Sequence, residues 1–309
     1  MSDIVVENFV KIYDVTPAVD RISLRIENGE LFGLIGPDGA GKTTLIRSIS
    51  TLLFPTEGKV YVRGMDITSH IAQIRSMIGY MPQRFSLYQD LTVEQNLLFF
   101  AELFQVPQDE RLKRLNQLYQ FSRLTAFKKR RAGALSGGMK QKLALSCALI
   151  HTPQILILDE PTFGVDPVSR QEFWHILKQI KQEGTTILVS TAYMDEATLC
   201  DRVALMFNGK IQAIDTPQHL QKSYPYPLYK LTARDLRALA QQFQRIDVVH
   251  TIQLFGDSLH VAFQKNPSAN DWQKWKQSAL GNFLEWEKQK PSIEDIFLDL
   301  MQKGHRQGE

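Results

Sequence analysis

The stretch GPDGAGKT, residues 36–43, decides the fold of this chain. It matches G-x-x-x-x-G-K-[ST], a pattern that binds phosphate where it joins a strand to a helix. The apolar run ELFGLIG (30–36) precedes it, and TTLIRSISTLL (43–53), which has helical spacing, follows it. Glycines let the backbone N–H groups of such a turn point inward, and the helix adds the positive end of its dipole. The sequence therefore predicts a phosphate site in an α/β domain.

Two side chains of this loop have distinct expected roles. We expect Lys42 to contact the β- and γ-phosphates of a nucleotide, and the Thr43 hydroxyl to ligate Mg²⁺. The alternative is a glycine-rich turn that holds no ligand. The residues expected to bind the nucleotide form one continuous run: Gly36, Pro37, Asp38, Gly39, Ala40, Gly41, Lys42, Thr43 and Thr44.

A second acidic motif, ILILDEP (155–161), complements the phosphate loop. Its apolar residues predict a buried strand, and Asp159 follows at the carboxyl end, where it can hold Mg²⁺. Glu160 comes next, and a carboxylate there can orient and polarise the water that attacks a phosphate. The alternative is an acidic strand end that caps the following helix.

The stretch LSGGMKQK (135–142) lies between these two motifs. Ser136, Gly137 and Gly138 precede an apolar-periodic helix, so they form a second helix N-terminus suited to an anion. One chain rarely needs two such sites for one nucleotide. We therefore expect this one to serve the nucleotide of a neighbouring chain, the alternative being a plain helix cap.

The length of 309 residues allows about two domains. We expect an α/β domain over 1–222, with a helical subdomain inserted at about 85–150, and a second domain over 224–309. The second domain is predicted to have β-α-β-β-α-β order, as in ferredoxin-like α+β units. Its elements are expected at 228–233, 235–246, 249–255, 258–263, 270–280 and 283–288, with a last helix at 291–302 whose Ser292 and Asp295 form a capping box.

Composition excludes several other classes of protein. The net charge of +3 gives no support to a nucleic-acid partner. No apolar stretch reaches the roughly 18 residues that span a bilayer, and the N-terminus lacks the features of a signal peptide. Cys147 and Cys200 lie in apolar surroundings, which favours reduced core thiols in the cytosol.

These motifs, in this order, resemble the ATPase subunits of ABC transporters. GPDGAGKTT resembles Walker A, LSGGMKQK the ABC signature and ILILDEP Walker B, over about residues 3–222. The closing segment PSIEDIFLDL resembles ATPases of ABC-2 type exporters, such as the daunorubicin-resistance and multidrug types, which carry a C-terminal accessory domain. The resemblance implies a P-loop NTPase (RecA-like) core with an inserted helical subdomain.

The resemblance also assigns roles to residues outside the main motifs. Gln83 is similar to the Q-loop glutamine, a catalytic switch and Mg²⁺ ligand, although it can also be an ordinary polar loop residue. Asp166 is similar to the D-loop aspartate, which faces the partner chain and contributes to catalysis. Tyr13 is similar to the aromatic residue that stacks on adenine, although it can also be a core or surface tyrosine.

The mechanism of the family follows by implication. Two ATPase domains, from a homodimer or a heterodimer, enclose two ATP molecules with Mg²⁺, and each nucleotide lies between Walker A of one chain and the signature of the other. Closure and opening drive ABC-2 type permease subunits, whose coupling helices meet the helical subdomain. The chain is then expected as a peripheral protein on the cytoplasmic face of the inner (plasma) membrane. The transported substrate contacts the permease, so this sequence does not identify it.

One position departs from the family pattern. In STAYMDEA (190–197), Ala192 stands where these ATPases carry a histidine that contacts the γ-phosphate. Either hydrolysis is only slowed, or this site mainly holds a dimer closed while another chain hydrolyses ATP. A regulatory subunit with little hydrolysis, or a soluble ABC protein without a transport role, are the remaining alternatives.

Overall fold

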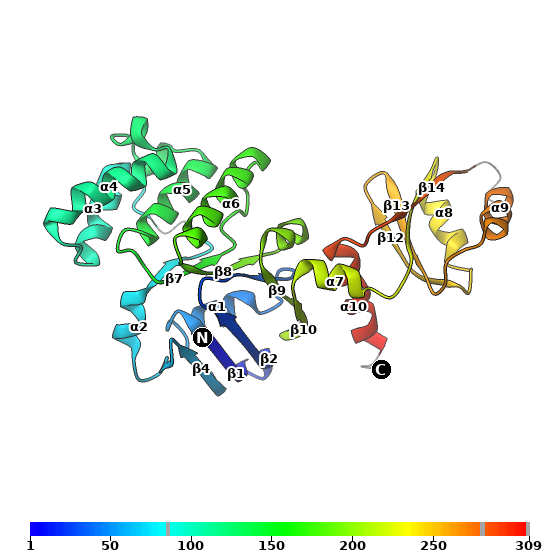
Figure 1. Ribbon diagram of the computed structural model, residues 1–309, viewed down its shortest axis with the longest axis horizontal. Coiled ribbons are helices and arrows are strands. Elements are labelled where there is room, and N and C mark those ends of the chain that lie inside the picture. The colour runs from blue at the N-terminus through cyan, green and yellow to red at the C-terminus, as the bar shows by residue number, and fades with distance from the viewer. Residues whose placement is uncertain (85–86, 279–281, 307–309) are drawn as a thin grey trace. The chain divides into compact units, whose positions relative to one another are not determined.

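The chain folds into two compact units, Met1–Thr216 and Pro217–Glu309 (Figure 1). The computed structural model describes residues 1–84, 87–278 and 282–306. The boundary lies earlier than the predicted one at 222–224, because helix α7 (Pro217–Ser223) packs against α10 (Ile293–Arg306) in the second unit. The predicted end of helix 270–280 and the last residues of the second domain lie outside the described residues.

The main sheet of the first unit has the order β10-β9-β3-β8-β7-β6. Neighbouring strands run parallel from β9 to β6, and β10 is antiparallel to β9. Every residue of β3, β7 and β8 is buried, which explains their continuous apolar sequence and confirms the predicted strands. The strands span Leu31–Ile35 (β3), Ile78–Met81 (β6), Ile155–Asp159 (β7), Thr186–Thr191 (β8), Arg202–Phe207 (β9) and Lys210–Asp215 (β10).

A helical segment is inserted between β6 and β7, two adjacent parallel strands. Helices α3, α4 and α5 gather together there, as Figure 1 shows. Thr92 and Gln95 form a capping box at the start of α3. This segment is the predicted helical subdomain, of which residues 85–86 lie outside the described part. Its helices span Val93–Leu103 (α3), Gln108–Ser122 (α4), Thr125–Phe127 (η1), Ala132–Ala134 (η2) and Gly137–Ala148 (α5).

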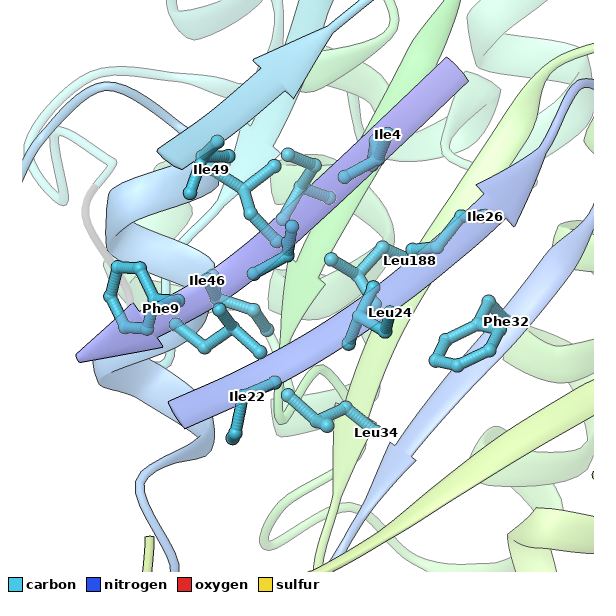
Figure 2. Close-up of a cluster of buried hydrophobic side chains, with 14 of the residues drawn as sticks. Ile4, Phe9, Ile22, Leu24, Ile26, Phe32, Leu34, Ile46, Ile49 and Leu188 are labelled. Atoms are coloured by element: carbon cyan, nitrogen blue, oxygen red, sulfur yellow. The ribbon is translucent and has the colours of Figure 1, made fainter. Parts of the chain in front are cut away.

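The first unit also contains an antiparallel sheet, of order β2-β1-β4-β5, which the sequence did not predict. The sheet packs over the main sheet and helix α1 (Lys42–Ile49), and Figure 2 shows the buried side chains between them. Ile4, Phe9 and Ile26 come from the antiparallel sheet and meet Phe32 and Ile46 there. Its strands span Ser2–Tyr13 (β1), Thr16–Glu27 (β2), Glu57–Val62 (β4) and Met65–Asp66 (β5). The unit also contains helices α2 (Ile71–Met77), α6 (Pro167–Gln182) and η3 (Met194–Leu199).

Two expectations from composition can be compared with the structure. Cys147 and Cys200 are free and buried, and burial raises the pKa of both thiols. Within the part of the chain that the structure describes, no helix is both long and apolar enough to span a bilayer.

The second unit contains an antiparallel sheet of order β12-β13-β11-β14. Numbered along the unit, this is strand order 2-3-1-4, which is the ferredoxin-like arrangement that was predicted. Its core packs Leu231, Val261, Phe263 and Trp272 against Phe243. The elements span Leu228–Ala233 (β11), Leu236–Phe243 (α8), Val249–Phe255 (β12), Ser258–Phe263 (β13), Ala269–Ser278 (α9) and Phe283–Gln289 (β14).

Helix α10 is attached to this sheet by two histidine–aspartate pairs, one buried and one partly buried. His260 Nδ1 lies 2.8 Å from Asp295 Oδ1, and His250 Nε2 lies 2.6 Å from Asp299 Oδ1. Asp295 also accepts bonds from the Ser292 hydroxyl and N–H, which forms the predicted capping box. Burial pushes the pKa of Asp295 up, but the bonds from His260 and Ser292 outweigh it and hold the pKa below its usual range.

Replacing Asp295 with Asn should destabilise the chain in a pH-dependent way. Because the folded pKa is depressed, the carboxylate stabilises the fold above the unfolded pKa of about 4, and this stabilisation is lost as the pH falls through the folded value. We expect Asp295→Asn to lower the free energy of unfolding by roughly 2 kcal/mol at pH 7 and to flatten its decline below about pH 4. Denaturant unfolding of the full chain at several pH values measures both effects.

Asp271→Asn is the matched control. Asp271 accepts the same two bonds from Ser268 at the start of α9, but it is exposed and no buried histidine is paired with it in the described contacts. Equal effects of the two substitutions would show that the cap alone, and not the contact with His260, accounts for the role of Asp295.

Candidate functional site

The phosphate loop connects the carboxyl end of β3 to the start of α1, and its backbone is held from both sides. Gly36 N–H donates to Thr191 O at the end of β8, at 3.2 Å. Gly41 is the N-cap of α1 with φ 101°, and a Cβ there would lie 2.5 Å from Ala18 O of β2. Only glycine fits this position, because the backbone is left-handed and the neighbouring strand approaches closely. No side chain caps α1, so its first N–H groups face the loop.

The loop borders a hollow of about 450 Å³. Gln83 and Glu160 also line it, so the structure brings residues of three predicted motifs together at one place. Ala18 of β2 also lines the hollow, and no motif in the sequence pointed to it. The lining residues are Ala18, Asp38, Gly39, Ala40, Gly41, Lys42, Thr43, Thr44, Gln83 and Glu160.

Lys42 is buried and paired with Glu160 inside this site. Its Nζ lies 3.0 Å from Glu160 Oε1, and it also donates to Gly36 O at 2.7 Å and Pro37 O at 3.0 Å. Both side chains are almost fully enclosed, at 3% and 5% exposure. Two opposite charges can be buried in this way because each neutralises the other and is hydrogen-bonded. These contacts use all three N–H donors of Lys42, so a phosphate that binds it has to replace one of the three acceptors, among which Glu160 is the anion.

Glu160 adopts an unusual backbone conformation directly after β7. Its φ is 49°, which is in the left-handed region that disfavours residues with a Cβ. Its N–H is held by Ser190 of β8, and Gln83 Nε2 donates to its Oε2 at 3.0 Å. Backbone strain of this kind is commonly stored at functional sites, where it fixes the direction of a reacting side chain.

Asp159 lies beside the phosphate loop with one carboxylate oxygen fully used. Thr43 Oγ1 donates to Asp159 Oδ1 at 3.1 Å, and Ser190 Oγ donates to the same atom at 2.8 Å. Burial raises the pKa of Asp159, and the bonds from Ser190 and Thr43 oppose the shift. Its Oδ2 is buried with no partner among the described residues. A hydroxyl next to a carboxylate oxygen without a partner fits Mg²⁺, which prefers oxygen ligands.

The remaining predicted residues lie outside this hollow. Ser136 is the N-cap of α5, where its hydroxyl accepts from Met139 N at 3.4 Å. Asp166 is the N-cap of α6 and accepts from Ser169 N at 2.9 Å; this backbone bond lowers the pKa of Asp166. A Cβ at Gly138 would lie 2.6 Å from the Ser169 side chain, so the two helix starts pack together.

Gly137 and Tyr13 show two further differences within this group. A Cβ at Gly137 would have its nearest neighbour at 3.8 Å, so the packing of this chain does not require glycine there. Tyr13 ends β1 with 46% of its surface exposed and does not line the hollow, and Lys11 Nζ lies 5.6 Å from its ring centre. A role of Tyr13 in binding a base therefore stays a prediction.

Ala192 follows directly after the last residue of β8. Thr191, the residue before it, donates through Oγ1 to Glu196 at 2.5 Å, and Thr162 donates to the same carboxylate at 2.9 Å. The guanidinium of Arg170 lies 4.7 Å from the centre of the Tyr193 ring. The contact with Arg170 engages the Tyr193 ring, which argues against Tyr193 as a substitute for an imidazole at position 192.

Comparisons with known proteins agree with this geometry. Residues 19–163 match the model of the family described as "ABC transporter". The chain is 38% identical to the probable multidrug ABC transporter ATP-binding protein YbhF of Escherichia coli over 287 residues, 92% of this chain and 49% of that protein. The chain therefore spans about half the length of that relative. It is also 38% identical over 215 residues to the linearmycin resistance ATP-binding protein LnrL of Bacillus subtilis, 69% of each chain.

A solved structure shows the same arrangement. The dimeric post-hydrolysis state of the ATP-binding cassette MJ0796, bound to ADP and Pi, superposes with a TM-score of 0.64 at 27% identity. It covers 69% of this chain and 98% of that one. The likeness confirms the predicted P-loop NTPase fold of the first unit.

Removing the cation of Lys42 tests the site directly. Lys42→Ala should weaken the binding of ATP about a hundredfold, because a buried charged hydrogen-bond donor to the phosphates is lost. It should also lower the free energy of unfolding by about 3 kcal/mol, because Glu160 stays buried without its counter-ion. Titration calorimetry and denaturant unfolding of the full chain measure these two quantities.

The double variant Lys42→Ala/Glu160→Gln separates the two effects. It should recover much of the stability, since the unpaired charge is gone, but it should not recover nucleotide binding. Unchanged affinity in Lys42→Ala would contradict the phosphate site itself.

Proposed function

The chain belongs to the ATP-binding proteins of ABC transporters, and on that premise we propose that it binds and hydrolyses ATP to energise an ABC-2 type membrane exporter. The observation that carries the proposal is the buried contact of Lys42 with Glu160 in the hollow that the phosphate loop borders. The names of YbhF and LnrL, which refer to multidrug transport and linearmycin resistance, support a drug-like cargo.

The residues of the site divide the work of hydrolysis. Lys42 holds the β- and γ-phosphates, and the N–H groups of the loop and of α1 bind the remaining phosphate oxygens. Once the phosphate has replaced it on Lys42, the Glu160 carboxylate orients the attacking water and accepts its proton. Gln83, which is hydrogen-bonded to Glu160, links this step to the start of the helical subdomain.

Thr43, Asp159 and Gln83 would hold Mg²⁺. The metal ion, when bound, neutralises phosphate charge. The fit rests on the Thr43–Asp159 contact and on the Asp159 oxygen that has no partner. Gln83 uses its amide nitrogen on Glu160, so its amide oxygen is the atom available to a metal.

We further propose that Ser136, Gly137 and Gly138 complete the ATP site of a second ATPase chain, with Asp166 at the contact. They lie outside this chain's own phosphate hollow, and the packing of Gly138 on Ser169 keeps the signature next to Asp166. Gly137 is exposed, and a Cβ there would only touch Gly164 O at 3.8 Å, which supports a group that arrives from outside this chain. The second unit, which contains no catalytic motif, would brace this assembly. The chain would then be a peripheral protein on the cytoplasmic face of the plasma membrane.

Ala192 favours a second candidate within this function, an ATP-binding subunit with slow hydrolysis. The methyl group cannot contact a γ-phosphate, and Tyr193 is held beside Arg170. In a heterodimer, this chain would then lend its signature to a faster site on its partner.

An apolar groove is our candidate docking site for the membrane partner. Its lining includes Met81 and Pro82, the two residues that precede Gln83 in the sequence. It has a volume of about 310 Å³ and is lined mainly by apolar side chains, among them Leu52, Met81, Leu87 and Phe104. Leu52 is 53% exposed. An apolar helix of the permease would cover this exposed apolar surface. The groove adjoins the Q-loop, so docking and hydrolysis would be coupled through Gln83.

Restoring a histidine tests the slow-site idea. Ala192→His should raise phosphate release by the assembled transporter up to about a hundredfold, since one polar contact to transition-state charge is worth ~3 kcal/mol. Glu160→Gln should abolish this gain. If the parent chain already releases phosphate rapidly and does not respond to Ala192→His, ATP hydrolysis by this chain would stand. The proposal of a slow site here and a faster site on a partner would then be contradicted. No phosphate release from any variant with its permease would refute the ATPase proposal.

Leu52→Asp tests the groove. The charge should prevent docking of the permease and abolish copurification with it, while ATP affinity of the isolated chain stays within about twofold. Leu112→Asp is the matched control, because Leu112 is 70% exposed on α4 and does not line the groove. Equal loss of copurification in both variants would contradict the assignment.

A further inference from the structure

Ser190 joins the two acidic residues of the site through one hydroxyl group. Its Oγ donates to Asp159 Oδ1 at 2.8 Å and accepts from the Glu160 N–H at 3.0 Å. Ser190 is fully buried in β8, so water does not compete for either bond. A polar group this deeply enclosed is costly unless it is bonded, and here both its donor and its acceptor capacity are used.

The register of the sheet explains why this position has that reach. Asp159 of β7 lies level with Ser190 of β8 in the parallel pair. Glu160 is the first residue beyond β7, and its N–H meets both the backbone oxygen of Ser190, at 3.2 Å, and the hydroxyl. Any residue at position 190 would supply the backbone oxygen. Only a hydroxyl-bearing residue also supplies the second acceptor for Glu160 and the donor for Asp159.

The Ser190 hydroxyl fixes the orientation of the Asp159 carboxylate. Thr43 and Ser190 both donate to Oδ1, so the plane of the carboxylate is fixed and Oδ2 is the oxygen left over. Without the Ser190 bond, Thr43 alone would hold Oδ1, and the carboxylate could rotate between its two oxygens. Groups that orient metal ligands in this way typically change metal affinity by 10- to 100-fold when they are removed.

The consequence for Glu160 concerns its left-handed backbone. A residue with a Cβ keeps a φ of 49° only if its surroundings hold it there. The Ser190 hydroxyl supplies one of the bonds that do so, and the side chain of Glu160 is aimed at Lys42 from this backbone.

We propose that Ser190 is a positioning residue of the ATPase site, which presents the free oxygen of Asp159 to Mg²⁺ and the carboxylate of Glu160 to the phosphate from one shared hydroxyl. This role rests on the proposed function. The role goes beyond the proposed function because it gives β8 a task separate from that of position 192, where related ATPases carry a histidine and this chain has alanine.

The test uses the full chain and a non-hydrolysable ATP analogue, and measures its affinity with and without Mg²⁺. Ser190→Ala should leave the Mg²⁺-free affinity within about twofold and reduce the gain from Mg²⁺ by about tenfold. Ser190→Thr keeps the hydroxyl and should retain the gain. Ser48→Ala is the matched control, because Ser48 is fully buried and its hydroxyl has no partner among the described residues.

Ser190→Cys, which keeps the size but is a weak hydrogen-bond donor, provides a second variant that should show the same loss as Ser190→Ala. An undiminished Mg²⁺ gain in both variants would overturn the role of Ser190. Unfolding of both, with Ser190→Thr folded, would overturn it too, because the hydroxyl would then serve stability alone. A parent chain whose affinity does not respond to Mg²⁺ would instead refute the metal site of the proposed function.

Discussion

The register of three parallel strands determines the whole site. Ile35 of β3 lies level with Thr191 of β8, and Asp159 of β7 lies level with Ser190. Because parallel strands end at one edge of the sheet, the phosphate loop, the acidic pair and the end of β8 meet within hydrogen-bond distance. A shift of one residue in the β7–β8 pair would turn the Asp159 side chain to the other face of the sheet and separate it from Thr43 of the loop.

The parts of this fold that sequence predicts best are those set by local chemistry. Residues 36–43 specify a strand, a turn and a helix within one short stretch, and the strands of the second unit follow alternating patterns bounded by turns. β1 escaped prediction because register shifts interrupt its pairing with β2 and its buried and exposed residues do not alternate regularly. β2 does alternate over residues 22–27, so part of this sheet carried a strand signal that was not used. The unit boundary differed because α7 packs through a contact with α10, which is distant in sequence.

The site was predicted residue by residue where a motif carried it, and less well where only packing did. Lys42, Thr43, Asp159 and Glu160 meet as their motifs implied. Ser190 and Ala18 belong to no motif, since a serine at the end of an apolar strand has many possible roles until its neighbours are known. Tyr13 shows the opposite case, in which a resemblance names a residue that the hollow does not include.

The ion pair of Lys42 with Glu160 gives nucleotide binding the character of an exchange. Lys42 is already paired with a carboxylate of the protein, so a phosphate that binds it competes with an anion that the chain itself holds. The net affinity is therefore smaller than the charges in the pocket suggest. In the proposed cycle the same carboxylate also competes with the departing phosphate for the lysine, and this competition would favour release of the product.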